Sequence, residues 1–185
     1  GSVDYNSLLE HAPLRGFERS ENDILLTYTG GTTGMPKGVM WRHKDFVFGC
    51  AGGGGYFTQS GPMTVPADMA DRAATGYPLK MLAIAPLMHA AALWAAWSGL
   101  FNGLTLVLDE SRTFDAEEIW SRVERLGVNI VQVVGDAMAM PLRDALLAHP
   151  GRWNLQGIVN FGSGGAVFSQ HVKDDLRKLL PETAN

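Results

Sequence analysis

The stretch YTGGTTGMPKGV (residues 28–39) is rich in glycine and threonine and contains one lysine. Every position from 29 to 34 is glycine or threonine, and Lys37 follows closely. Glycine lets ligand oxygens approach backbone amides, threonine adds hydroxyl donors, and lysine adds one compact positive charge. Because a run of amides after a strand can bind an anion, the stretch predicts a phosphate site. The alternative is a plain turn, which would need far fewer glycines.

The spacing of this loop differs from that of the P-loop nucleotide hydrolases, which require G-x-x-x-x-G-K-[ST]. Pro36 precedes Lys37 and Gly38 follows it. Neither the second glycine nor the magnesium-binding hydroxyl of that motif is therefore in place. The sequence predicts a phosphate loop of another kind.

The elements that must position this loop alternate between strands and helices. We expect strands in segments 23–29, 80–86, 104–109, 128–135 and 156–166, and helices in segments 87–101, 115–127, 136–149 and 169–180. Such alternation indicates parallel pairing through right-handed crossovers, and strands that are apolar throughout suit a sheet covered on both faces. The predicted fold class is therefore α/β, with a mostly parallel sheet covered by helices.

Local signals mark the ends of several elements. Asp115 should be the N-cap of the helix in segment 115–127, and Gly127 should end it. Pro141 should kink or delay the helix that contains it, and Ser169 should cap the last helix. Residues 49–78 are rich in glycine and proline, and we interpret them as a mobile surface loop, although a loop of that length can also be functional.

Composition and charge exclude several classes of protein. The chain has 185 residues, of which 46% are hydrophobic and 18% charged, as in a soluble globular protein. A net charge of −4 without a basic stripe argues against a nucleic-acid partner, and no apolar run is long enough to span a membrane. The single cysteine, Cys50, cannot form an internal disulfide, which favours a reducing compartment such as the cytoplasm. Without a basic neighbour to lower its pKa, we give it no catalytic role.

Residues 29–38 resemble the phosphate-binding signature of the adenylate-forming superfamily, which contains acyl-CoA synthetases, peptide-synthetase adenylation domains and luciferases. The usual form of that signature, [ST]-[SG]-[SG]-T-[ST]-G-x-P-K-G, is met at every fixed position. The segment APLMHAAALW (85–94) resembles the P-x-x-H segment of the family, and FGSGGAVFS (161–169) resembles its adenine-flanking turn. WRH (41–43) is similar to a subset of actinobacterial fatty-acyl and steroid-acyl-CoA synthetases.

The resemblance implies part of the large N-terminal domain of such a synthetase. Residues 1–22 would be a lead-in, whose opening Gly1-Ser2 resembles a cleavage scar, and residues 23–185 would be part of the ATP- and acyl-binding domain, with the small C-terminal domain absent. The implied reaction activates a fatty or steroid-derived acid with ATP and Mg²⁺ as an acyl-adenylate, and then forms the CoA thioester. Because the family's adenine-stacking segment and catalytic lysine are not in the sequence, we expect the chain alone to be inactive.

The resemblance also assigns roles to individual residues. The phosphate contacts would be Thr29, Gly30, Gly31, Thr32, Thr33, Gly34 and Lys37. His89 would lie beside the acyl carboxylate as the catalytic histidine, and Gly164, Gly165 and Ala166 would lie against the adenine and ribose. No residue of the chain is expected to bind the metal directly. Alone, a histidine at a helix start or a glycine turn after a strand is often merely structural.

Several other residues have two interpretations. Met88, Trp94, Trp97 and Met138 could line an acyl tunnel, but such residues on alanine-rich helices are usually part of the core. Asp136 follows a strand at a position where ligands often bind, yet we expect it to cap the next helix. His11, His149 and His171 should be solvated.

Two other functions remain open beside an acyl-CoA synthetase with a carboxylic acid, ATP and CoA as its partners. One is an adenylating enzyme that loads a carrier protein in place of CoA. The other is a non-catalytic nucleotide-binding module.

Overall fold

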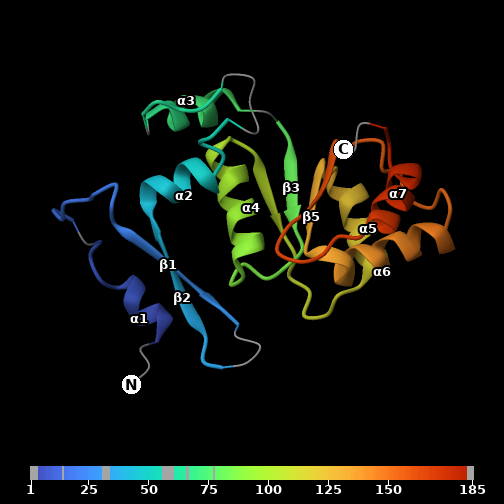
Figure 1. The fold of residues 1–185 in the computed structure, drawn as a ribbon, viewed down its shortest axis with the longest axis horizontal. Helices are drawn as coiled ribbons and strands as arrows, with labels where there is room; N and C mark the ends of the chain where they lie inside the picture. The colour runs from blue at the N-terminus through green and yellow to red at the C-terminus, as the bar shows by residue number, and fades with distance from the viewer. Residues whose placement is uncertain are drawn as a thin grey trace.

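The computed structural model describes residues 4–13, 15–30, 34–55, 61–65, 67–76 and 78–182. Figure 1 shows the arrangement of its helices and strands. The helices are α1 (Tyr5–Leu9), α2 (His43–Gly49), α3 (Ala67–Thr75), α4 (Ala90–Phe101), α5 (Ala116–Leu126), α6 (Gly135–Ala148) and α7 (Gln170–Leu179), and the strands are β1 (Ile24–Thr29), β2 (Lys37–Arg42), β3 (Lys80–Ala83), β4 (Thr105–Leu108), β5 (Ile130–Val133) and β6 (Asn160–Ser163).

The larger sheet has four parallel strands in the order β4-β3-β5-β6. Helix α4 covers one face, while α5, α6 and α7 lie on the other side of the sheet (Figure 1). Ala92 of α4 packs against Ala83 and Ala85, so the alanines let this helix lie close to the strands. The predicted α/β class with a mostly parallel sheet is confirmed.

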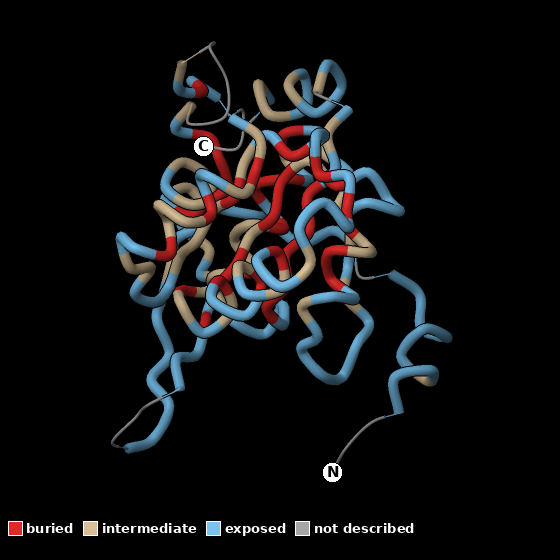
Figure 2. The backbone as a smooth tube through the Cα atoms, turned by 90° about the vertical axis from the view of Figure 1, so that its right-hand side faces the viewer, coloured by how far each residue is buried: buried red, intermediate tan, exposed pale blue. Residues whose placement is uncertain are grey.

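The main hydrophobic core lies between the sheet and helices α5, α6 and α7. Leu82, Trp120, Leu142 and Val172 are fully buried there, and the buried backbone gathers in the same region in Figure 2. The polar atom of the Trp120 ring is also hydrogen-bonded, since Nε1 donates to the carbonyl oxygen of Leu142 at 2.9 Å. The largest buried side chain of this layer therefore has its polar atom paired.

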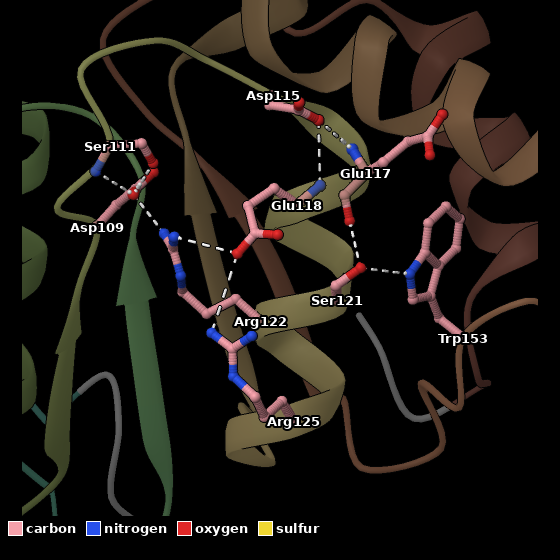
Figure 3. Close-up of polar contacts among 9 residues, drawn as sticks. All are labelled: Asp109, Ser111, Asp115, Glu117, Glu118, Ser121, Arg122, Arg125 and Trp153. Carbon is pink, nitrogen blue, oxygen red and sulfur yellow. Dashed lines mark hydrogen bonds and ion pairs between the residues drawn. The ribbon is translucent and has the colours of Figure 1, made fainter.

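Helix α5 begins and ends where the sequence predicts. Oδ1 of Asp115 accepts from the backbone N–H groups of Glu117 and Glu118 at 3.0 and 3.1 Å (Figure 3). Gly127 ends the helix with φ 62° and ψ 48°, a left-handed conformation that favours glycine. Arg122 extends from the same helix to an ion pair with Asp109, which follows β4.

The start of α6 and the cap of α7 differ from expectation. Helix α6 begins at Gly135 and continues through Pro141, so the proline does not delay it. Pro141 removes one helix hydrogen bond, and burial of Leu142 offsets the loss. Ser169 is the N-cap of α7, but its hydroxyl makes no capping bond and is buried without a partner among the described residues.

Strands β1 and β2 form a separate antiparallel hairpin, with Ile24 opposite Arg42 and Thr29 opposite Lys37. The prediction that β1 is buried is wrong: Leu26 and Tyr28 are exposed, and Thr27 is the buried residue of the strand. The hairpin extends away from the larger sheet (Figures 1 and 2). The predicted strand therefore exists, but it belongs to another sheet.

The segment 49–78 was expected to be a loop, and it contains helix α3. The run ADMADRAAT has alanine and charged residues that favour a helix, but the surrounding glycines and prolines obscured that signal. Within the part of the chain that the structure describes, no helix is long and apolar enough to cross a membrane.

Candidate functional site

A pocket of about 740 Å³ lies between helix α4, strands β3, β5 and β6, and the segment that follows α2. Its lining residues come from both halves of the chain, and they are Gly49, Cys50, Gly52, Met81, Ala90, Ala91, Trp94, Ala95, Ser98, Ile130, Gln132, Asn160, Gly164 and Gly165. The pocket brings together Trp94, Gly164 and Gly165, which were all predicted from the sequence. Most of its wall is apolar or small, which suits an apolar ligand.

The glycine turn after β6 forms one end of this pocket. Gly165 has φ 87°, and a Cβ added there would lie 3.3 Å from the Cβ of Ala91. The turn therefore approaches the first turn of α4 as closely as a residue without a side chain allows. Ala166 does not line this pocket. It lines a second pocket of about 470 Å³ beside α7.

The turn between β5 and α6 holds the glycine turn in position. The Gly135 N–H donates to Ser163 Oγ at 2.8 Å, and the Asp136 N–H donates to the Val167 carbonyl at 2.9 Å. Asp136 Oδ1 accepts from the Ser169 N–H at 2.9 Å, and this bond holds the carboxyl pKa below its ordinary value. The prediction that Asp136 caps its own helix is wrong, because Val134 is that N-cap and the carboxylate holds the start of α7 instead.

His89 directly precedes, in the sequence, two residues that line the pocket. It is the N-cap residue of α4 with an exposed side chain that makes no capping bond. Ala90 and Ala91, which follow it, line the pocket, whereas His89 itself does not. The imidazole is therefore free to turn toward a ligand at this end of the pocket.

The described residues among the predicted phosphate contacts lie at the end of the β1–β2 hairpin. Thr29 Oγ1 donates to the Lys37 carbonyl at 3.3 Å, and the Lys37 side chain is exposed. A Cβ added at Gly30 or Gly34 would have no atom of the described residues within 4 Å, so bare backbone is open to a ligand there. Open backbone and an exposed ammonium suit the oxygens of a triphosphate. Gly31, Thr32 and Thr33 lie outside the described residues.

The described residues of the phosphate loop, Thr29, Gly30, Gly34 and Lys37, do not line the 740 Å³ pocket, but a pair of tryptophans joins their hairpin to it. Trp41 of β2 contacts Trp94 of α4 edge to face, with ring centroids 5.3 Å apart and an interplanar angle of 81°. Through this contact Trp41 of the WRH segment packs against a residue that lines the pocket. The sequence indicated the segment but not its partner.

Of the four residues proposed for an acyl tunnel, Trp94 lines the pocket and the others do not. Met88 is 77% exposed, Trp97 is 38% exposed and packs on Phe101, and Met138 packs against the core. Residues that sequence reasoning missed include Gln132 and Ser98. The signal for Gln132 was a single polar residue inside the apolar strand IVQV.

The remaining candidates have limited roles in the site. Cys50 lines the pocket, and burial raises the pKa of its thiol. His11 and His171 are exposed, whereas His149 Nε2 contacts Glu117 Oε1 at 3.2 Å and is not merely solvated. Among the described ranges, no group of three or more histidine, cysteine, aspartate or glutamate residues is placed to hold a metal ion.

Comparison with known proteins identifies relatives of the whole chain. The family described as AMP-binding enzyme matches residues 7–185. A medium/long-chain-fatty-acid–CoA/3-oxocholest-4-en-26-oate–CoA ligase of Mycolicibacterium smegmatis is 40% identical over 98% of this chain and 33% of its own length. A 3-oxocholest-4-en-26-oate–CoA ligase of Rhodococcus rhodochrous is 36% identical over the same shares. The chain thus spans about a third of the length of the curated relatives it matches.

Solved structures share the fold. The inhibitor-bound N-terminal domain of FACL13 from Mycobacterium tuberculosis superimposes with a TM-score of 0.68 and 25% identity, over 94% of this chain and 39% of that one. O-succinylbenzoate coenzyme A synthetase from Bacillus subtilis, in complex with AMP, gives a TM-score of 0.62 at 20% identity, over 97% of this chain and 41% of that one.

Proposed function

Because the chain belongs to the AMP-binding enzyme family, we propose that it forms the phosphate- and acid-binding part of an ATP-dependent acid–thiol ligase. The complete protein would activate a carboxylic acid as an acyl-adenylate and then transfer the acyl group to CoA. The observation that carries this proposal is the 740 Å³ pocket, which has a bare glycine turn at one end and an apolar wall along α4. The cytoplasm is the compartment we propose for it.

The acid would be a fatty or a steroid-derived acid. Relatives at 36–40% identity are named as ligases for such acids. The pocket supports the same class, because Met81, Trp94 and Ile130 present apolar surface and the alanines of α4 leave room beside it. An apolar acid gains free energy when this surface is removed from water.

The phosphate loop would stabilise the departing pyrophosphate. Backbone amides at Gly30 and Gly34 and the Lys37 ammonium would donate to the β- and γ-phosphate oxygens, and the Thr29 hydroxyl would join them by leaving the Lys37 carbonyl to which it donates. By the same motif, Gly31, Thr32 and Thr33 would contribute to this contact. Mg²⁺, when bound with ATP, would neutralise part of the phosphate charge. Donors that are already fixed in a loop stabilise developing charge without reorganising.

The acid and the nucleoside would meet at the glycine-turn end of the pocket. Gly164, Gly165 and Ala166 would lie against the adenine and ribose, since the first two have no side chain to exclude a ring. His89 would orient the acid carboxylate from the start of α4, next to Ala90 and Ala91. The carboxylate would thereby be held toward the α-phosphorus that it attacks.

The decisive test is Lys37→Ala in the complete protein, measured by AMP release from ATP, an acid and CoA. We expect kcat/KM for ATP to fall by about 10²-fold, as when one preorganised donor is removed. Because Lys37 is exposed, thermal unfolding should not change. Lys44→Ala is the matched control, since the Lys44 ammonium pairs with Glu21 at 2.7 Å and has no part in the loop. Unchanged kinetics in Lys37→Ala would remove this residue from the site.

A further inference from the structure

Residues 133–136, at the end of β5 and the start of α6, contact the glycine turn after β6 at both of its ends. At the β6 end, the Gly164 N–H donates to the Val133 carbonyl at 3.3 Å, and the Gly135 N–H donates to Ser163 Oγ at 2.8 Å. The first residues of the turn are therefore held by a segment that is distant in the sequence, and not by the turn alone.

At the α7 end, Asp136 makes two hydrogen bonds to the same stretch of chain. Its N–H donates to the Val167 carbonyl at 2.9 Å, and its Oδ1 accepts from the Ser169 N–H at 2.9 Å. A carboxylate that accepts from a backbone N–H makes a stronger hydrogen bond than a neutral acceptor does. Both ends of the stretch 163–169 are thus bonded to two consecutive residues, Gly135 and Asp136.

Gly135 also packs directly against the turn. It has φ 59°, and a Cβ added there would lie 2.5 Å from the Val167 carbonyl oxygen and 2.7 Å from the Ala166 Cβ. Because neither distance leaves room for a carbon atom, a side chain at this position would displace Ala166 and Val167. Gly127, at the end of α5, has nearly the same φ of 62°, but a Cβ added there would have no described atom within 4 Å. The two glycines therefore share a backbone conformation, and only Gly135 supports the turn.

We infer that Gly135 and Asp136 are positioning residues for the nucleoside of ATP. They act through the stretch 163–169, whose residues Gly164, Gly165 and Ala166 are proposed to lie against the adenine and ribose. A ring that lies on bare backbone depends on the exact place of that backbone, so the residues that fix the turn also fix the ring. The inference rests on the proposed function, because it concerns the nucleotide of the same site. The wall of the acid pocket along α4 is not held by these two residues.

The first test compares Gly135→Ala with Gly127→Ala in the complete protein. Both variants place an alanine in a left-handed conformation, so both carry the same kind of backbone strain, but only Gly135→Ala displaces the turn. We expect KM for ATP, from AMP release at saturating acid, to rise by about tenfold or more in Gly135→Ala, since a misplacement of about 1 Å can cost about 10²-fold. Gly127→Ala should keep the parent KM for ATP. In both variants KM for the acid, measured at saturating ATP, should change far less.

The second test removes the carboxylate that holds the start of α7. Asp136→Ala loses the bond to Ser169 and should raise KM for ATP by about threefold to tenfold, as for the loss of one hydrogen bond. Asp136→Asn should restore much of this loss, because its amide oxygen can accept from the same N–H. The matched control is Asp115→Ala, whose carboxylate accepts from the N–H groups of Glu117 and Glu118 at the start of α5, away from the turn. It should lower the thermal stability and leave KM for ATP unchanged.

The outcomes separate this inference from the proposed function. If the parent protein releases no AMP with ATP, CoA and a fatty or steroid-derived acid, the ligase proposal fails and the inference fails with it. If the parent is active but Gly135→Ala and Asp136→Ala keep its KM for ATP, the ligase proposal stands and the inference is overturned. An equal rise of KM for ATP in Gly127→Ala or Asp115→Ala would also overturn it, since lost stability would then explain the effect. Should Gly135→Ala fail to fold in thermal unfolding, the two Asp136 variants decide.

Discussion

The helical layer formed by α5, α6 and α7 and the hairpin formed by β1 and β2 differ in how they are stabilised. The layer encloses Trp120, Leu142 and Val172, all of them inaccessible to solvent. The hairpin exposes 47% of Leu26 and 62% of Tyr28, and its far end presents open backbone at Gly30. The contrast is visible in Figure 2, where buried backbone fills the centre and the hairpin is pale blue.

This difference indicates that the helical layer stabilises the fold and that the hairpin is available to bind a ligand. In the helical layer, close packing fixes the position of each side chain. The layer can therefore hold the glycine turn in place through the hydrogen bonds of Gly135 and Asp136. In the hairpin, packing leaves the backbone at Gly30 and Gly34 uncovered, so the amides of these two residues remain available to a ligand. Substitutions in the layer should therefore change stability, and substitutions in the phosphate loop should change binding.

The largest effect is expected for Trp120→Ala. The ring is fully buried and Nε1 donates to the Leu142 carbonyl, so its removal leaves a cavity and also removes this hydrogen bond. We expect the free energy of unfolding to fall by about 3–5 kcal/mol, measured by urea denaturation. Trp97→Ala is the matched control on α4, where the ring is 38% exposed, and it should cost about 1 kcal/mol. Equal losses of unfolding free energy in the two variants would contradict the contrast between the buried helical layer and the exposed surfaces.

The sequence predicted the helical layer well because its signals are local. Asp115 and Gly127 mark the ends of α5 through a cap and a left-handed residue, both of which act within a few positions of the chain. Ile119 and Val123, four residues apart, lie on one face of that helix, and both are buried. In this region the residues that form the core are also the ones that give the periodic pattern.

Where the prediction failed, the determining contact was distant in sequence. The apolar run 23–29 indicated a buried strand, but its antiparallel partner β2 follows a glycine loop and has only three apolar residues in a row, at 39–41. The carboxylate of Asp136 bonds to Ser169 rather than to its own helix, and spacing does not reveal that contact. The pocket residues Ser98 and Gln132 were missed for the same reason, since only the packing of α4 on the sheet brings them together.

Substituting one glycine in each of the two regions, Gly127 and Gly34, should have a smaller effect than Trp120→Ala. Gly127 has φ 62°, so Gly127→Ala should cost about 1 kcal/mol of unfolding free energy through backbone strain alone, because a Cβ there would touch nothing. A Cβ at Gly34 would also touch nothing, but this residue is not among the described glycines with positive φ. Gly34→Ala should leave the unfolding free energy unchanged and raise KM for ATP, because the methyl group occupies space proposed for phosphate. If Gly34→Ala instead destabilised the fold and spared KM, the loop would be structural.

The smallest effect is expected from the pH dependence of the hydrogen bond between the Ser169 N–H and Asp136, which joins the glycine turn after β6 to the turn between β5 and α6. The Ser169 N–H lowers the pKa of Asp136 below the ordinary aspartate value of about 3.9 in the folded chain. A carboxyl with a lowered folded pKa stabilises the fold above its ordinary pKa, and the contribution is lost as the pH falls through the folded pKa. Asp136→Asn should therefore be less stable than the parent at pH 7, and the difference should vanish in the most acidic part of a urea-denaturation series from pH 7 to pH 2. Asp45→Asn, which breaks an exposed ion pair with Arg42 beside the hairpin, should have a smaller effect at pH 7. If the difference in unfolding free energy between Asp136→Asn and the parent persisted unchanged at pH 2, the charge of Asp136 would not be what stabilises the glycine turn. The packing of the side chain would then hold it.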